Sequence, residues 1–190
     1  MTAGEITLGE TADIDALLAL HRTWYESNYK INIPLMQTIF PAGNDRFLMF
    51  NLNGHPYFGV DEVTHLWEFY AATDQFEMPE DYVMRVDVSG DMGYVCSEGV
   101  FRAYTYRAED GTPLPDGAVL PYEERYRATE IYKRVSGDGG TEWKMWHYHC
   151  SLLPAADEVP PAKTAAESSA VRGMGNTPTS SRIAVLDRTG

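Results

Sequence analysis

One stretch of the chain, WKMWHYHCS, runs from Trp143 to Ser151 and decides how the rest is interpreted. Its alternating residues predict a β-strand, because successive side chains of a strand point to opposite faces. One face of this strand begins with Trp143 and Met145 and continues with His147 and His149. An unpartnered buried polar group costs about 1–3 kcal/mol, so a strand that only fills a core would stay apolar along its buried face. The change from apolar to titratable residues favours the wall of a ligand pocket.

The composition bounds the class of protein. The chain has 190 residues, of which 44% are hydrophobic and 12% aromatic, and this indicates one soluble domain with a filled core. A formal net charge of −13 argues against nucleic acid or a membrane surface as partner. No apolar run approaches the ~20 residues needed to cross a bilayer, and the opening residues lack the pattern of a signal peptide. With only Cys96 and Cys150 present, we expect reduced thiols in a cytoplasmic protein.

Helices are predicted first along the chain and long strands afterwards. Apolar spacing predicts helices over 11–29, 34–40 and 60–72, and strands over 47–52, 81–89, 93–106, 122–135 and 141–153. This order indicates an α+β domain in which helices cover one face of a curved antiparallel sheet. We assign residues 1–10 to an N-terminal arm, 11–154 to the domain and 155–190 to an extended tail. That tail is rich in Pro, Ala, Ser and Gly, and Ile183–Leu186 is its expected anchor.

Several motifs follow one another in an order that resembles a known family. They are Trp24-Tyr25 in the first helix, Gly59–Val63 at the start of another, Arg127-x-Thr129, and the strand from Trp143 to Ser151. Over about residues 14–154 the chain resembles the SnoaL-like branch of the nuclear transport factor 2-like (NTF2-like) superfamily. The resemblance implies a cone-shaped fold, in which a strongly curved sheet and helices enclose one deep pocket.

The resemblance also implies a range of activities. The superfamily includes ketosteroid isomerases, polyketide cyclases, scytalone-type dehydratases, epoxide hydrolases, diarylpropane lyases that release formaldehyde, and members without known catalysis. This chain lacks an evident Asp or Glu base on its last strand, which disfavours enolisation driven by a carboxylate. The fold therefore indicates where a site lies, while the chemistry depends on its residues.

The register of the last hairpin determines which residues face the pocket. A turn centred on Asp138 predicts the pairs Ile131–Met145, Thr129–His147 and Arg127–His149, and directly opposed residues share a face. A slip of one residue would instead bring Glu130 and Tyr126 to that face. We favour the first register because it pairs apolar residues at the base of the pocket.

We expect the catalytic residues to be His149, His147, Arg127 and Tyr25. Histidine is the natural general acid or base near neutral pH, and Arg127 would hold a phenolate or a developing oxyanion. Alternatively, the histidines are hydrogen-bonded core residues, and Arg127 lies on the outer face, paired with Glu124 or Asp87. Residues expected to contact the substrate are Trp24, Asn28, Asn51, Ser97, Phe101, Thr129 and Met145, although each could equally serve only the packing.

The strand 93–106 has two contrasting faces. The first is unusually small in volume and leaves room for a neighbour or a ligand, with Val95, Ser97, Gly99, Phe101 and Ala103. The other carries mixed aromatic and charged residues that suit a subunit interface, including Tyr94, Glu98 and Arg102. We therefore expect a homodimer or homotrimer formed through the outer face of the sheet.

The sequence predicts a cofactor-independent lyase that acts on a small aromatic substrate. Aromatic and Met side chains match flat apolar ligands, such as a lignin-derived diarylpropane or a polyketide-like compound, and a histidine would drive loss of water or formaldehyde. The alternatives are an isomerase or epoxide hydrolase with the same pocket, or a non-catalytic ligand-binding module. No cofactor motif is present, and two histidines without a nearby carboxylate or thiolate do not predict a metal site.

Overall fold

The computed structural model describes residues 7–43, 46–137, 140–153 and 183–185. Its elements, in chain order, are β1 (Thr7–Leu8), α1 (Thr11–Tyr29), α2 (Ile33–Gln37), β2 (Leu48–Phe50), β3 (Pro56–Phe58), α3 (Gly59–Thr73), β4 (Asp74–Phe76), β5 (Glu80–Ser89), β6 (Met92–Thr105), β7 (Leu120–Gly137), β8 (Gly140–Leu152) and β9 (Ile183–Val185). The predicted three helices and five strands all form, and the further strands are short. The prediction of an α+β fold is confirmed.

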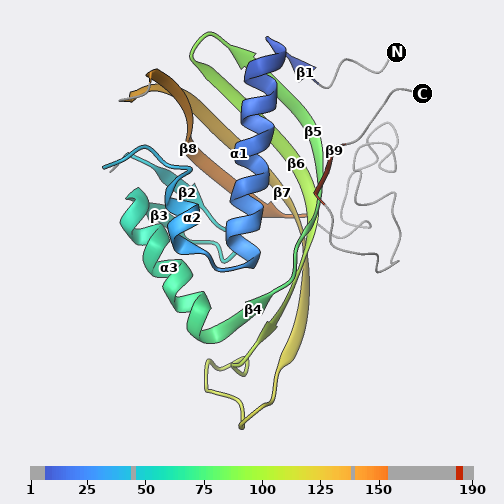
Figure 1. Cartoon of the computed structure of the whole chain (residues 1–190). Coiled ribbons are helices and arrows are strands. Elements are labelled where there is room, and N and C mark those ends of the chain that lie inside the picture. The colour runs from blue at the N-terminus through green and yellow to red at the C-terminus, as the bar shows by residue number, and fades with distance from the viewer. Residues whose placement is uncertain (1–6, 44–45, 138–139, 154–182, 186–190) are drawn as a thin grey trace, which may run out of the picture.

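The helices lie on the concave side of a strongly curved sheet (Figure 1). In α1, Leu17, His21 and Trp24 fall on one buried face because they recur at helical spacing. The side chain of Asn32 accepts a hydrogen bond from the backbone N–H of Leu35 and so caps α2. The apolar face of α1 therefore closes the cone from one side, and α3 closes it from another.

The sheet has the order β1-β5-β6-β7-β8-β2-β3, while β4 pairs with β6 and β9 with β5. Its long central strands β5 to β8 are antiparallel, as predicted. Three short strands pair in parallel instead, namely β1 and β9 with β5 and β2 with β8. The sheet is therefore mixed rather than wholly antiparallel. The parallel pairings are possible because long connections separate those strands along the chain.

The hairpin of β7 and β8 departs from the predicted register. Ile131 pairs with His147, but the next pair is Tyr132 with Met145, so Trp146 is an extra residue on β8. This β-bulge exchanges the two faces of β8 at Trp146. Met145 consequently lies on the face opposite to His147, whereas plain alternation had placed the two side by side.

The expected tail anchor lies partly within the described residues. Ile183–Val185 form β9, which pairs in parallel with Asp81–Val83 on β5. Leu186, residues 1–6 of the predicted arm and most of the predicted tail lie outside the described residues.

Gly99 allows two parts of the domain to approach each other closely. It pairs with Tyr126 on β7, and the Tyr126 side chain crosses directly over it. A Cβ atom at this position would overlap the Tyr126 hydroxyl and would lie 2.5 Å from the carbonyl oxygen of Glu80. The absent side chain is thus what lets Tyr126 lie flat across β6.

We expect Gly99→Ala to destabilise the fold by about 1–3 kcal/mol, the usual cost of inserting a methyl group into a packed interior. Urea unfolding followed by tryptophan fluorescence measures this change. An unchanged free energy of unfolding would contradict the close packing of Tyr126 and Glu80 against Gly99.

Candidate functional site

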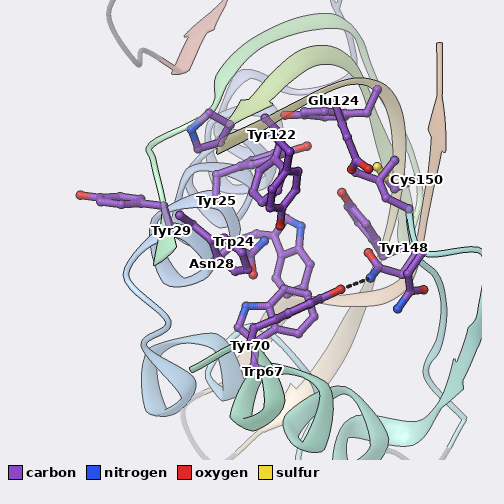
Figure 2. Close-up of a pocket in the computed structure, with 17 residues that line it drawn as sticks. Trp24, Tyr25, Asn28, Tyr29, Trp67, Tyr70, Tyr122, Glu124, Tyr148 and Cys150 are labelled. Atoms are coloured by element: carbon purple, nitrogen blue, oxygen red, sulfur yellow. Dashed lines mark hydrogen bonds between the residues drawn. The ribbon is translucent and has the colours of Figure 1, made fainter. Parts of the chain in front are cut away.

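A cavity of about 210 Å³ lies between the helices and the sheet (Figure 2). Most of its wall is aromatic, and the remaining residues are mainly neutral and polar. The residues that line it are Trp24, Tyr25, Asn28, Tyr29, Asn51, Leu52, Asn53, Trp67, Tyr70, Phe76, Pro79, Phe101, Tyr122, Glu124, Tyr126, Tyr148 and Cys150. Such a wall suits a flat apolar ligand.

Glu124 is the only carboxylate among the described residues that line the cavity. It lies on β7 opposite Phe101 of β6, and no described residue donates a hydrogen bond to it. Partial burial raises the pKa of the Glu124 carboxyl, because leaving water disfavours its charged form. A carboxylate with a raised pKa and free oxygens is suited to accept a proton from a bound molecule.

The negative charge of Glu124 helps to raise the pKa of two tyrosine hydroxyls and a thiol in the cavity wall. Burial raises the pKa of Tyr70 to about 12 and that of Cys150 to about 12, and it also raises the pKa of Tyr122. All three groups are therefore protonated at neutral pH. The Tyr122 hydroxyl donates to Asp74 at 3.3 Å. Asn51 Nδ2 donates to the Tyr70 hydroxyl at 3.2 Å, so Tyr70 keeps its own proton for a ligand.

Two indoles and one amide bring further polar atoms to the cavity wall. The Nε1 atoms of Trp24 and Trp67 and the Oδ1 atom of Asn28 are buried and have no hydrogen-bond partner among the described residues. Trp24 is fully buried and Trp67 is 4% exposed. Buried polar atoms are nearly always paired in folded proteins, so these three unpaired atoms are exceptions.

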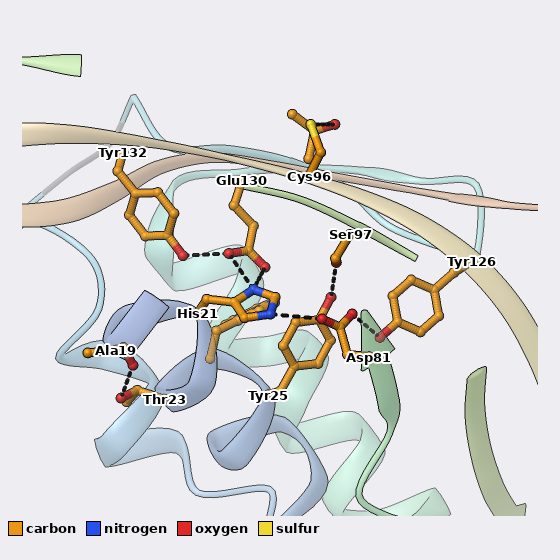
Figure 3. Close-up of polar contacts among 12 residues, drawn as sticks. Ala19, His21, Thr23, Tyr25, Asp81, Cys96, Ser97, Tyr126, Glu130 and Tyr132 are labelled. Atoms are coloured by element: carbon orange, nitrogen blue, oxygen red, sulfur yellow. Dashed lines mark hydrogen bonds and ion pairs between the residues drawn. The ribbon is translucent and has the colours of Figure 1, made fainter. Parts of the chain in front are cut away.

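Behind the cavity lies a fully buried network centred on His21 (Figure 3). Its Nε2 lies 2.8 Å from Asp81 Oδ2, and its Nδ1 lies 3.0 Å from both carboxylate oxygens of Glu130. Tyr132 donates to Glu130 and Tyr126 donates to Asp81 Oδ1. Because Tyr126 also lines the cavity, this network holds part of the cavity floor in place.

His21 carries a positive charge in this network. Burial alone would lower its pKa, but the negative charges of Glu130 and Asp81, together with their hydrogen bonds, raise it to about 10. The imidazolium donates from both ring nitrogens and separates two buried carboxylates that would otherwise repel each other. A buried charge is tolerated when it is paired and hydrogen-bonded in this way.

Five of the sequence-predicted site residues line the cavity: Trp24, Tyr25, Asn28, Asn51 and Phe101. Two others belong to the buried interior beside it. Ser97 lies 3.4 Å from the Tyr25 hydroxyl, and Met145 is fully buried in the core. The prediction that the small face of β6 points inward is confirmed by Val95, Ser97 and Ala103, which are all buried.

The prediction that His147, His149, Arg127 and Thr129 face the cavity was wrong. His149 and Thr129 form a pair, and Arg127 pairs with Ser151 on the same outer face of the sheet. His149 is exposed, and Arg127 forms an ion pair of 2.7 Å with Glu98. Thr129 lies 3.7 Å from the sulfur of Cys96. The cause is the bulge at Trp146, which turns Tyr148 and Cys150 inward in place of the histidines.

His147 is held on the outer face by the neighbouring strand. Its Nδ1 donates to the carbonyl oxygen of Leu48 at 2.7 Å, and its ring packs against that of Phe50 in a T-shaped contact. Burial lowers the pKa of His147, and the carbonyl hydrogen bond only partly opposes this. The ring therefore serves the packing of β2 on β8.

Sequence reasoning missed Glu124, Tyr122, Tyr148 and Cys150 as cavity residues. The signal lay in the long alternation of β7, whose even-numbered residues from 122 to 132 include four aromatic or apolar side chains. Its odd-numbered residues carry Glu123, Arg125, Arg127 and Lys133 and have the composition of a solvent face. The alternation of β7 therefore indicates the inner face correctly, whereas the alternation of β8 does not.

Comparison with known proteins defines the fold. No protein-family model matches the chain, and no curated protein matches its sequence. Solved structures do match. A ketosteroid isomerase-like protein from Erwinia carotovora atroseptica is 15% identical with a TM-score of 0.57, covering 76% of this chain and 99% of its own. A proposed dehydratase of the NTF2-like family from Streptomyces avermitilis is 19% identical with a TM-score of 0.56, covering 77% of this chain and 100% of its own.

A third match has a different biological description. It is a proposed calcium/calmodulin-dependent protein kinase type II association domain from Thiobacillus denitrificans, 17% identical with a TM-score of 0.53, covering 72% of this chain and 94% of its own. The domain therefore has the NTF2-like fold, and that part of the prediction is confirmed. The same fold occurs in proteins described as ketosteroid isomerase-like, as a proposed dehydratase and as a proposed association domain, so the function rests on the cavity.

Two further properties of the described residues bear on the kind of site. No helix in the described ranges is long and apolar enough to cross a membrane. Within these ranges, no three or more His, Cys, Asp or Glu side chains are grouped so that they could hold a metal ion.

Proposed function

We propose that this protein is a cofactor-independent enzyme of the lyase or isomerase class, in the SnoaL-like branch of its fold. It would move a proton at a carbon atom of a small ring-containing substrate. The observation that carries this proposal is Glu124, a half-buried carboxylate in an aromatic cavity, with a raised pKa and no hydrogen-bond donor among the described residues. It takes the role that the sequence had assigned to His147 and His149.

The lining of the cavity supports separate roles for Glu124 as the base and Tyr70 as the acid. The Glu124 carboxylate accepts a proton from a substrate carbon, and the electron pair of the broken C–H bond forms a C=C bond. In an elimination, the C–O bond at the next carbon breaks and the leaving oxygen takes the Tyr70 proton, so that water departs. Glu124 then returns its proton to Tyr70 through solvent. In an isomerisation, Glu124 gives the proton back to a different carbon, and Tyr70 only hydrogen-bonds the substrate oxygen.

The cavity volume limits the substrate. An apolar cavity of about 150 Å³ holds one benzene ring, and drug-sized ligands occupy about 300 Å³ or more. At about 210 Å³, this cavity favours a single ring with substituents or two fused rings. We therefore favour a ring-hydroxylated or polyketide-like compound that loses water over a diarylpropane that loses formaldehyde.

The proposal is tested with a panel of ring-hydroxylated aromatic compounds and cyclic hydroxyketones in D₂O. We expect at least one member to lose water, isomerise or take up deuterium at carbon in the presence of the protein, as followed by proton NMR. Compounds that bind without any exchange or elimination would contradict an enzyme and would indicate a ligand-binding module.

A further inference from the structure

Aromatic rings lie next to the Glu124 carboxylate on the inner face of the sheet. Phe101 is directly opposite Glu124 in the ladder of β6 and β7. Tyr122 and Tyr126 are each two residues from Glu124 along β7, so they share its face of the strand. The ring centroids of Phe101 and Tyr122 are 6.0 Å apart. Figure 2 shows Glu124 and Tyr122 on the sheet side of the cavity and Tyr70 on the side of α3.

A ligand in the cavity can reach this carboxylate and these rings. Glu124, Phe101 and Tyr122 line the cavity, and each is half-buried rather than fully buried. Burial raises the pKa of the Glu124 carboxyl, and no described residue donates a hydrogen bond that would oppose the rise. A carboxylate that has lost part of its water without gaining a partner is stabilised by a cation that reaches it.

The charges around the cavity are predominantly negative. No Lys, Arg or His is found among the described residues that line it. Asp74 lies behind the Tyr122 hydroxyl and accepts its hydrogen bond. In the network behind the floor, the single imidazolium of His21 is shared by the two carboxylates of Asp81 and Glu130. The formal net charge of the whole chain is −13, so a cationic ligand is attracted and an anionic one is repelled.

We propose that Tyr70, Phe101, Tyr122 and Glu124 form an aromatic cage that binds small organic cations, namely aromatic compounds with a quaternary or protonated amino group. The faces of aromatic rings attract such a cation, and quaternary ammonium groups are commonly recognised in this way. A single ring with one such substituent matches the cavity volume of about 210 Å³. The inference rests on the proposed function only in using the same cavity, where the cation competes with the substrate.

The cage is tested with two probes of nearly equal shape, phenyltrimethylammonium and tert-butylbenzene, which differ in having a charged nitrogen or a neutral carbon at one position. Their dissociation constants are measured by titration of tryptophan fluorescence. The charge preference is defined as the dissociation constant of the neutral probe divided by that of the cation. We expect it to exceed 1 in the wild-type protein. Glu124→Gln removes the negative charge and should lower the charge preference by about 5- to 30-fold.

A second variant tests the rings, and two matched variants serve as controls. Phe101→Leu keeps an apolar side chain but removes a ring face, so it should lower the charge preference by about 2- to 5-fold. Glu123→Gln makes the same change as Glu124→Gln on the outer face, and it should have no effect. Phe58→Leu replaces a ring that is 61% exposed and does not line the cavity, and it should also have no effect.

A charge preference of 1 or less in the wild-type protein would overturn the cage, as would the absence of phenyltrimethylammonium binding. An unchanged charge preference in either Glu124→Gln or Phe101→Leu would overturn it as well. Equal loss in Glu123→Gln would also do so, because the effect would then come from the overall charge of the protein.

The cage and the enzyme proposal can fail separately. Binding of the cation without turnover of any compound would support the cage and contradict the enzyme. Loss of turnover in Glu124→Gln, together with a wild-type charge preference of 1 or less, would support the enzyme and overturn the cage.

Discussion

Replacing Glu124 by glutamine should lower turnover of any confirmed substrate by about 10²- to 10⁴-fold, the usual contribution of a general base. Glutamine has nearly the same shape but cannot accept a proton, and no described residue depends on the Glu124 carboxylate for a hydrogen bond. Stability and substrate affinity should therefore change little. Steady-state kinetics should show the loss in kcat rather than in KM.

The adjacent residue provides a matched control. Glu123 lies on the same strand but points to the outer face, where it accepts a hydrogen bond of 2.8 Å from Arg102. Glu123→Gln makes the same chemical change one position away and should leave kcat unchanged. Equal effects of the two substitutions would contradict the role of Glu124.

The pH dependence of turnover by the wild-type enzyme gives an independent test of Glu124 as the base. As a base, Glu124 acts in its ionised form, so turnover should rise with pH as this carboxyl loses its proton. Because burial raises the pKa of Glu124, this increase in turnover should occur at a higher pH than for an exposed glutamate with a pKa of 4.5. A rate that is flat with pH across this range would contradict the assignment.

His21→Ala should produce the largest loss of stability, about 3–5 kcal/mol, which is the usual effect of breaking a buried charge pair. The substitution leaves Asp81 and Glu130 buried without the cation that lies between them. Chemical denaturation measures this loss. The exposed His65 on α3 is the matched control, and His65→Ala should change the free energy of unfolding by no more than about 0.5 kcal/mol.

The same histidine should make wild-type stability depend on pH. The pKa of His21 is about 10 in the folded protein against an ordinary value of 6.5. A raised folded-state pKa means that the stabilisation is fully present below pH 6.5 and is lost as the pH rises toward 10. The free energy of unfolding should fall across this window, and His21→Ala should remove most of that fall. An equal fall in the wild-type protein and in His21→Ala would show that another group causes the pH dependence.

The sequence was sufficient to predict the elements and the class of fold, because their signals are local and periodic. The helix predicted over 11–29 is α1, and the alternating face of β6 with Ser97 and Phe101 does point inward. The inner residues of α1 followed from the same periodicity, so Trp24, Tyr25 and Asn28 could be placed in the cavity wall from sequence alone.

The sequence was not sufficient to place the last strand. The β-bulge at Trp146 adds one residue to β8, and no glycine or proline between Trp143 and Ser151 marks it in the sequence. Every side chain beyond the bulge then changes face, which explains why His147 and His149 were assigned to the wrong side. The partnership of His21 with Asp81 and Glu130 was also hidden, since 60 and 109 positions separate these residues along the chain.

The bulge on β8 also bears on how the chemistry of such a protein could change. If Trp146 were instead paired with a residue of β7 in a regular ladder, Met145 would stay inside and the rest of the strand would exchange its faces. Imidazoles would then replace the phenol and the thiol of Tyr148 and Cys150 in the cavity wall. One unpaired residue in the ladder therefore separates two sets of functional groups, and no substitution of the groups themselves is required.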